Sequence, residues 1–248
     1  MSKIIIANWK MNPVSLIEAK RKFEIIKKRV RNIKKVEAVV CAPFVFLPVL
    51  KPSKYLKLGA QDCFWGDKGP FTGEVSPQQL KKLGVEYVIL GHSERRRYLA
   101  ESTELVNQKI KAALEAGLKV VFCVGSKAKK PGKEMERQLK EGLKGVKRPD
   151  LNKLVFVYEP VWAISTTKNK IIATSKEALK GGLYMRNVLK KIFDKKTAKK
   201  TKIIYGGSVN SKNIGSFIKE GKMVGGLPGA ASLDPYEFAK IVIQASRS

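Results

Sequence analysis

Eight short runs of β-forming apolar residues recur along the whole 248-residue chain, and this repetition limits the possible folds more than any other feature. Each run is continuous, which is typical of parallel strands that are covered on both faces. The runs lie near residues 3–7, 36–42, 56–61, 85–90, 119–124, 154–158, 202–205 and 223–227. A sheet built from such strands needs helices to cover it.

Segments with helical spacing and helix-start signals separate the runs. Ser15 and Glu18 have the spacing of a capping box. The residues that keep one face of this first helix apolar are Leu16, Ala19, Phe23, Ile26 and Val30. Ser76-Pro77 and Asp234-Pro235 each place an N-cap before a proline at the first helical position. The chain therefore alternates strand and helix.

The alternation continues from end to end without a linker or low-complexity segment, so we expect a single domain over residues 1–248. The fold class is α/β. Eight parallel strands in about 250 residues favour closure into a single (β/α)8 barrel with outer helices over an open, doubly wound sheet. The first run is followed by Asn8-Trp9-Lys10 and not by G-x-G-x-x-G, which argues against a dinucleotide-binding domain.

Composition excludes several classes of function. The three cysteines are widely spaced and the chain has one histidine, so we expect reduced thiols, no metal site and no cofactor. No apolar stretch approaches the roughly 20 residues that cross a bilayer. The N-terminus opens with Lys3-Ile4-Ile5-Ile6, without a signal-peptide pattern, and we expect no membrane segment and a cytoplasmic location.

The charge is unusual, because 50 Lys and Arg residues face 21 Asp and Glu residues and give a formal net charge of +29. Such an excess attracts anionic ligands and favours contact with polyanions. The densest basic runs are residues 20–35, 127–133 and 190–202. They are expected to form solvated outer faces. Nonspecific electrostatic binding of nucleic acid stays open as a secondary activity, although no nucleic-acid-binding motif accompanies the charge.

Polar and glycine-rich residues collect just after the carboxyl ends of the expected strands. They include Asn8, Lys10, Gln61, Asp62, residues 92–95, Glu159, residues 206–208, Gly229 and Ala230. In a barrel these ends share one rim, where the active sites of the fold lie. The segments Tyr205–Asn210 and Leu227–Ala230 follow the seventh and eighth strands, a common place for a phosphate site, although a glycine pair there is often only a turn.

Glu159 and His92 are the candidate acid–base residues. Glu159 has apolar neighbours on both sides in Val-Tyr-Glu-Pro-Val-Trp, and burial would raise its basicity; the alternative is a structural ion pair. His92 is either a structural histidine or a catalytic ring, and the charged residues beside it favour catalysis. Lys10 and Asn8 are two residues apart on an extended strand end, so both are expected to point into the mouth of the barrel.

Six segments together resemble the triosephosphate isomerase family, in order and at that family's spacing. They are Ala7–Asn12, Gly59–Asp62, Phe71–Glu74, Gly91–Arg96, Tyr158–Ile164 and Tyr205–Asn210. The resemblance runs from the first strand to the last helix. It implies a TIM barrel and a cofactor-free isomerase of glycolysis and gluconeogenesis that interconverts dihydroxyacetone phosphate and D-glyceraldehyde 3-phosphate through an enediolate.

The resemblance also implies a role for each matching residue. Glu159 would remove a proton from the carbon beside the carbonyl, and His92, as a neutral imidazole, would polarise the carbonyl; these roles are the ones described for this enzyme family. Lys10 and Asn8 would stabilise the enediolate charge, and Glu94 would position this network. Arg95 would pair with acidic groups behind it.

A second group of residues would bind and enclose the phosphate. The backbone N–H groups that the resemblance assigns to phosphate are those of Ser165, Ser208, Gly229 and Ala230. The lid and the apolar residues that close over the glutamate are represented by Trp162, Ile164 and Leu227. The loop Phe64 to Glu74, with Thr72, resembles the family's intersubunit loop, so a homodimer is implied.

Three positions depart from the family pattern. The lid segment Ser165–Ala173 lacks the usual Gly-Thr-Gly tip and is about three residues longer than usual. Ala230, after Pro228, replaces a usual glycine, and phosphate binding is expected to survive if the backbone there does not need a positive φ. Ser126 replaces a usual glutamate and is expected to weaken a contact of the lid with Trp162. The rival enzyme class is another phosphate-binding barrel, such as a sugar-phosphate epimerase.

Overall fold

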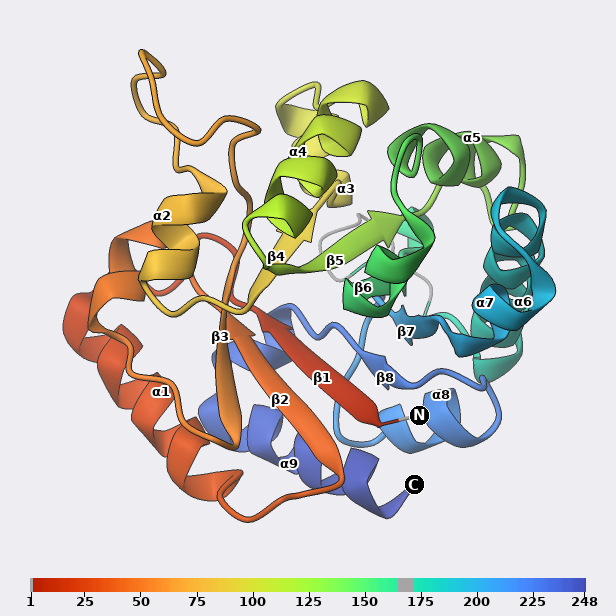
Figure 1. Ribbon diagram of the computed structural model, residues 1–248. Helices are drawn as coiled ribbons and strands as arrows, with labels where there is room; N and C mark the ends of the chain where they lie inside the picture. Colours follow the sequence, from red (N-terminus) through yellow and green to blue (C-terminus); the bar gives the residue numbers. More distant parts are fainter. Residues whose placement is uncertain (1, 165–171) are drawn as a thin grey trace.

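The computed structural model describes residues 2–164 and 172–248, and its central feature is a closed barrel of parallel strands in the order β1 to β8 (Figure 1). The strands are β1 Lys3–Asn8, β2 Val36–Cys41, β3 Leu56–Ala60, β4 Tyr87–Leu90, β5 Lys119–Val124, β6 Leu154–Tyr158, β7 Lys202–Tyr205 and β8 Gly225–Gly226. The first strand pairs with the last through Ile4 and Gly225, which closes the sheet. The prediction of a (β/α)8 barrel is confirmed.

Helices surround the barrel and connect each strand to the next (Figure 1). The α-helices are α1 Leu16–Arg29, α2 Pro77–Lys82, α3 Ser93–Tyr98, α4 Thr103–Glu115, α5 Lys133–Gly142, α6 Ser175–Ile192, α7 Lys195–Lys200, α8 Ile214–Lys219 and α9 Pro235–Arg247. Short 3-10 helices are η1 Phe44–Val49, η2 Arg148–Lys153, η3 Val161–Ala163 and η4 Ala230–Leu233. No helix within the described ranges is long and apolar enough to cross a bilayer.

The strands are apolar on both faces because each face lies against a different core. Side chains that point into the barrel include Ile4, Ile6, Val39, Ile89, Val121, Val157 and Ile204. Their neighbours in sequence, such as Ile5, Val40, Val88 and Phe156, pack against the helices. Successive side chains of a strand point to opposite faces, so one continuous apolar run supplies side chains both to the barrel interior and to the contact with the outer helices.

Local signals place the helix ends, with two corrections in α1. Ser15 accepts a hydrogen bond from the Glu18 N–H, but the Glu18 carboxylate pairs with Lys22 at 2.9 Å instead of returning to Ser15. Leu16, expected on the apolar face, is 43% exposed, because it occupies the first turn before the helix lies against the barrel. The caps at Ser76 and Asp234 are as expected.

β8 is shorter than its expected range of 223–227. Gly225 has a φ of +159°, and a Cβ atom on it would lie 1.7 Å from the carbonyl oxygen of Ile4. The backbone of β8 therefore approaches β1 so closely that only glycine fits. Regular pairing stops after Gly226, and the chain leads into residues 227–229 at the rim.

Candidate active site

The candidate residues converge at the rim formed by the carboxyl ends of the strands. A small cavity there is lined by Asn8, Lys10, His92, Ile164, Gly206, Gly207, Leu227 and Gly229. These residues follow β1, β4, β6, β7 and β8, so the barrel assembles them from distant parts of the chain. An adjoining cavity of about 270 Å³ shares Asn8, Lys10 and His92 and extends toward Gln61 and Glu94.

Lys10 is held in an uncommon backbone conformation with its ammonium at the cavity. Its φ is 53°, in the left-handed region. Its N–H donates to Asn8 Oδ1 at 3.0 Å, and its carbonyl accepts from Gln61 Nε2 at 2.9 Å. Its Nζ lies 2.5 Å from Glu94 Oε1. Gln61, which the sequence placed only at the rim, thus fixes the strained backbone that aims Lys10.

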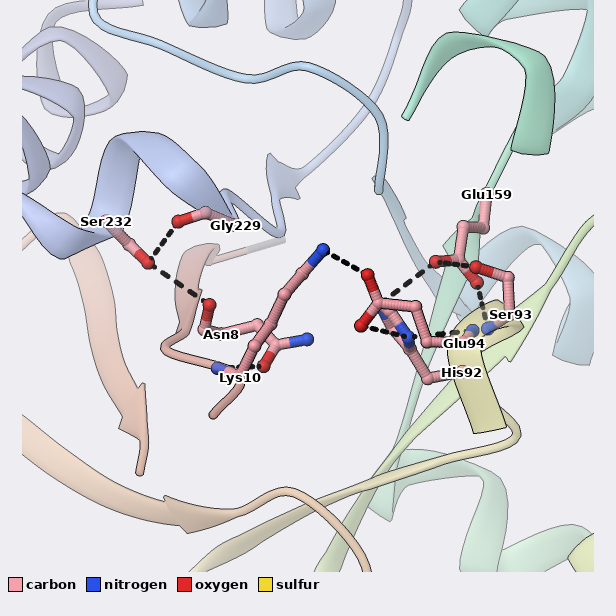
Figure 2. Close-up of polar contacts among 8 residues, drawn as sticks. All are labelled: Asn8, Lys10, His92, Ser93, Glu94, Glu159, Gly229 and Ser232. Atoms are coloured by element: carbon pink, nitrogen blue, oxygen red, sulfur yellow. Dashed lines mark hydrogen bonds and ion pairs between the residues drawn. The ribbon is translucent and has the colours of Figure 1, made fainter. Parts of the chain in front are cut away.

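The structure indicates the tautomer of His92. The side chain is buried at the N-cap of α3, and its Nδ1 accepts a hydrogen bond from the Glu94 N–H at 3.3 Å. An N–H that points at Nδ1 makes this nitrogen the acceptor and leaves the ring proton on Nε2. Nε2 lies 3.1 Å from Glu159 Oε1 (Figure 2). The geometry therefore fits a neutral imidazole that donates from Nε2.

Glu159 is 2% exposed and is held by Ser93 (Figure 2). The Ser93 N–H donates to Oε2 at 3.0 Å, and the Ser93 hydroxyl donates to Oε1 at 2.9 Å. The carboxylate lines a second cavity, of about 360 Å³, together with Ser93 and Arg96, and it does not line the cavity of Lys10 and Asn8. The structure thus joins Glu159 to His92 but leaves it apart from Lys10.

Ser93 was not singled out from the sequence as a functional residue. The available signal was its position directly after His92, where a serine at the start of a helix offers both a hydroxyl and an N–H without an intrahelical acceptor. These two groups point at the same carboxylate, which only the fold brings near.

Behind the rim lies a network of four charged side chains, of which Asp62, Glu101 and Lys109 are buried and Arg95 is partly exposed. Arg95 contacts Asp62 at 2.8 Å and Glu101 at 3.1 Å, the pairing with acidic groups that the family resemblance implied. Lys109 contacts Asp62 at 2.8 Å and Glu101 at 2.5 Å. Burial alone would raise the pKa of Glu101, but the hydrogen bonds and charges of Lys109 and Arg95 lower it. The network fixes α3, which carries His92, against α4 and the segment after β3.

The backbone N–H groups expected to bind phosphate differ in whether they already donate a hydrogen bond within the protein. Gly229 and Ala230 stand at the start of η4, where the first N–H groups have no intrahelical acceptor. Ala230 is not among the residues with positive φ, so the condition for replacing glycine is met. The Ser208 N–H instead donates to the Ala163 carbonyl at 3.2 Å, and the Ser208 hydroxyl donates to the same oxygen at 3.0 Å. Ser165 lies outside the described residues.

Of the lid and cap residues that the structure describes, Ile164 and Leu227 are buried beside the cavity and Trp162 is half-buried. Ile164 and Leu227 are 6% and 3% exposed and line the cavity next to His92. Trp162 Nε1 is buried and has no hydrogen-bond partner among the described residues. The hydroxyl of Ser126 lies 3.5 Å from the Ala128 carbonyl and makes no bond to Trp162. The rest of the lid segment, residues 165–171, lies outside the described ranges.

Comparison with known proteins agrees with this geometry. The model of a protein family described as triosephosphate isomerase matches residues 3–245. A triosephosphate isomerase of Dictyoglomus turgidum is 40% identical over 97% of this chain and 98% of its own. Those of Caldanaerobacter subterraneus and Dehalococcoides mccartyi are each 43% identical, over 96% and 99% of this chain and 98% of their own. Within the described residues, no group of three or more His, Cys, Asp or Glu side chains is arranged to hold a metal.

Proposed function

The chain belongs to the triosephosphate isomerase family, and from this premise we propose how its own residues carry out the reaction. It is an isomerase that interconverts dihydroxyacetone phosphate and D-glyceraldehyde 3-phosphate, the family's step in glycolysis. The rival assignment to a sugar-phosphate epimerase is not favoured. The observation that carries our proposal is the position of His92, which touches both Glu159 and the cavity lined by Lys10 and Asn8.

In this proposal Glu159 is the base. Its carboxylate leaves Ser93 and turns past His92 into the cavity when substrate binds, where it takes a proton from C1 of dihydroxyacetone phosphate. The C1–H electron pair then forms the C1–C2 double bond of an enediolate, and the carbonyl oxygen at C2 gains the negative charge. A proton then moves from the oxygen on C1 to the oxygen on C2, and return of the abstracted proton from Glu159 to C2, as the C1–O bond becomes a carbonyl, gives the aldehyde. Ile164 and Leu227, both buried at the cavity, support this role because they would exclude water around the carboxylate.

His92 and Lys10 act on the oxygens. The Nε2–H of His92 donates to the substrate carbonyl, gives its proton to the oxygen on C2 and takes back the proton of the oxygen on C1, a role that the Glu94 N–H on Nδ1 supports. The ammonium of Lys10 and the amide of Asn8 face the same cavity and stabilise the developing negative charge. Glu94 holds Lys10 in place before substrate arrives. We propose Glu94 as a positioning residue, since it contacts Lys10 and His92.

We propose that the phosphate binds at the N-terminal end of η4. The N–H groups of Gly229 and Ala230 support this site, and a helix start favours anions. Ser208 would join them only after its N–H releases the Ala163 carbonyl, so its contribution depends on movement of the segment that contains Ala163. Ser165, Trp162 and the remaining lid residues are proposed to complete the enclosure.

The assignment is tested with purified protein and glyceraldehyde 3-phosphate, coupled to a dehydrogenase that consumes dihydroxyacetone phosphate. We expect turnover with this substrate and none with a pentulose 5-phosphate. Turnover of the pentulose phosphate alone would instead support an epimerase.

We also propose a homodimer. The loop Phe64 to Glu74 projects from the barrel between β3 and α2 (Figure 1). Phe64 stacks on Trp65 with ring centroids 4.0 Å apart and contacts Phe71 at 4.5 Å, so the loop is held in shape, with Thr72 exposed. The exposed apolar side chains that a partner could cover include Met11, Val14, Ile17, Val45, Tyr98 and Leu99. A mass measurement in solution tests this proposal.

Three further expectations, on domain organisation, location and nucleic-acid binding, are also proposals. Residues 1–248 are proposed to act as one domain, which the match over residues 3–245 supports. The glycolytic role of the family supports a cytoplasmic location. Nonspecific nucleic-acid binding is proposed on the net charge of +29 and would be separate from catalysis.

A further inference from the structure

One group of basic residues lies at the end of the barrel opposite the active site. Residues 144–153 and 187–202 together hold eleven Lys and Arg residues against two carboxylates, Asp150 and Asp194. The first segment leads directly into the N-terminal end of β6 and the second into that of β7. The active site lies at the other ends of these strands, so the two surfaces face away from each other.

The two segments form one surface because side chains join them. Arg148 pairs with Asp194, the N-cap of α7, at 3.3 Å. Arg186 on α6 donates to the carbonyl of Ala198 on α7 at 2.7 Å, and Ala198 is buried. Figure 1 shows α6 and α7 side by side. The exposed cations of this basic surface are Lys144, Lys147, Arg148, Lys190, Lys191, Lys195, Lys196, Lys199 and Lys200.

The lysines of α7 are arranged at a cost to the fold. Lys195 and Lys199, like Lys196 and Lys200, are four residues apart and repel each other across one helical turn. Lys195 and Lys196 also occupy the first turn, where the helix dipole disfavours positive charge. The helix dipole therefore favours the positions of Lys199 and Lys200 in the last turn but not those of Lys195 and Lys196 in the first. An array of cations held against repulsion is stabilised when a polyanion neutralises it.

The surroundings favour a phosphodiester backbone over a membrane. Among the described residues of η2, α7 and α6 from Tyr184 onward, no large hydrophobic side chain is strongly exposed, and the nearest on α6 is Leu183, which is 52% exposed. A surface that inserts into a bilayer needs such side chains. Closely spaced lysines on a fixed helix match the regular negative charges of a nucleic acid, and nothing in the array reads base edges.

We propose that this basic surface binds the phosphate backbone of a nucleic acid without sequence preference. Because the surface is at the far end of the barrel, binding leaves the active site open. Counterion release makes the affinity strongly dependent on salt, with a slope of log K against log salt near −4 for about four to five phosphates neutralised on a duplex.

The test measures fluorescence anisotropy of a labelled, mixed-sequence DNA duplex at several salt concentrations. The variant K195Q/K196Q/K199Q/K200Q is compared with K82Q/K129Q/K130Q/K133Q, whose lysines are exposed and lie outside the surface. Each variant lowers the net charge from +29 to +25, since four lysines are removed. We expect the first to weaken binding at least about tenfold and to flatten the salt slope by about three, and the second to change affinity less than about threefold.

Isomerase turnover and circular dichroism report folding in both variants. If the first variant folds poorly, K147Q/R148Q removes two cations at the start of η2 instead and is expected to weaken binding about three- to tenfold. Equal loss in the α7 variant and its control would overturn the proposal, because total charge would then explain binding. It is overturned equally if the protein does not bind the duplex at low salt, or binds only vesicles of anionic lipid.

Discussion

Both hydrogen-bond donors of Ser93 are bonded to the carboxylate of Glu159, the N–H at 3.0 Å and the hydroxyl at 2.9 Å. A carboxylate that is 2% exposed needs such donors, because an unpaired buried charge is costly. The bonds also hold Glu159 away from the cavity that contains Lys10. Ser93 therefore stabilises the position from which the proposed base must depart.

Ser93→Ala removes the hydroxyl bond and keeps the backbone bond. We expect the free energy of unfolding to fall by about 1.5–3 kcal/mol, the range for one hydrogen bond to a charged group. Urea denaturation measures it. Ser246→Ala is the control, because that hydroxyl donates only to the Ile243 carbonyl of its own helix and should change stability by less than about 0.5 kcal/mol. Equal effects would show that Ser93 does not stabilise the buried carboxylate.

The fold could be predicted from the sequence because the strands carry their signal locally. Eight continuous apolar runs in a chain of this length are compatible with few folds. Neighbouring residues such as Ile4 and Ile5 are both apolar, and this local pattern is enough to predict a strand that is buried on both faces. Leu16 was misplaced because helical periodicity does not show where a helix first meets the barrel. β8 was overestimated because the approach of Gly225 to Ile4 is a tertiary contact.

The site was predicted less completely. Glu159, His92, Lys10 and Asn8 were identified from motifs, but their contacts join residues far apart in the chain. The bond of Ser93 to Glu159 spans 66 residues, and that of Gln61 to Lys10 spans 51. The hydrogen bond from the Ser208 N–H to the Ala163 carbonyl likewise cannot be predicted from the sequence around either residue. Such contacts depend on the closed barrel, which places separate strand ends side by side.

Lys10→Ala removes the cation at the cavity. We expect kcat to fall at least about a hundredfold, as for loss of one group that stabilises developing negative charge. Glu94→Gln keeps Lys10 but removes the carboxylate that pairs with its Nζ at 2.5 Å. Lys10 is then held less firmly, and kcat should fall by about tenfold. The matched control is Lys35→Ala, an exposed lysine before β2 at the other end of the barrel, which should leave kcat unchanged. Steady-state kinetics give kcat for the three variants. An inactive Lys35→Ala would contradict the specific role assigned to Lys10.

Glu101→Gln should destabilise the fold in a pH-dependent way. The pKa of Glu101 is lowered in the folded state, so its stabilisation is present above its ordinary pKa of 4.5 and is lost as the pH falls through the lowered value. The variant leaves Lys109 and Arg95 short of a buried partner, at a cost of about 3–5 kcal/mol near neutral pH. We expect the difference from wild type to shrink between about pH 5 and pH 3. Exposed Glu115→Gln is the control, and a difference independent of pH would contradict the network.

The positive charge should also speed the encounter with an anionic substrate. We expect kcat/KM to fall as ionic strength rises while kcat stays nearly constant, because salt screens approach and not proton transfer. Initial rates at low and high salt give both constants. If kcat/KM does not change with salt, the net charge of +29 does not steer the substrate.

The most direct test of the account is the turnover of Glu159→Gln in the coupled isomerase assay. The amide keeps the shape of the carboxylate but cannot accept the proton, so the account predicts active wild-type protein and a loss of kcat of about a thousandfold or more in the variant. Circular dichroism should show an intact fold. Glu134→Gln removes a carboxylate that lines the same cavity as Glu159 and should keep nearly full activity. Turnover of Glu159→Gln close to wild type would contradict the assignment of Glu159 as the base.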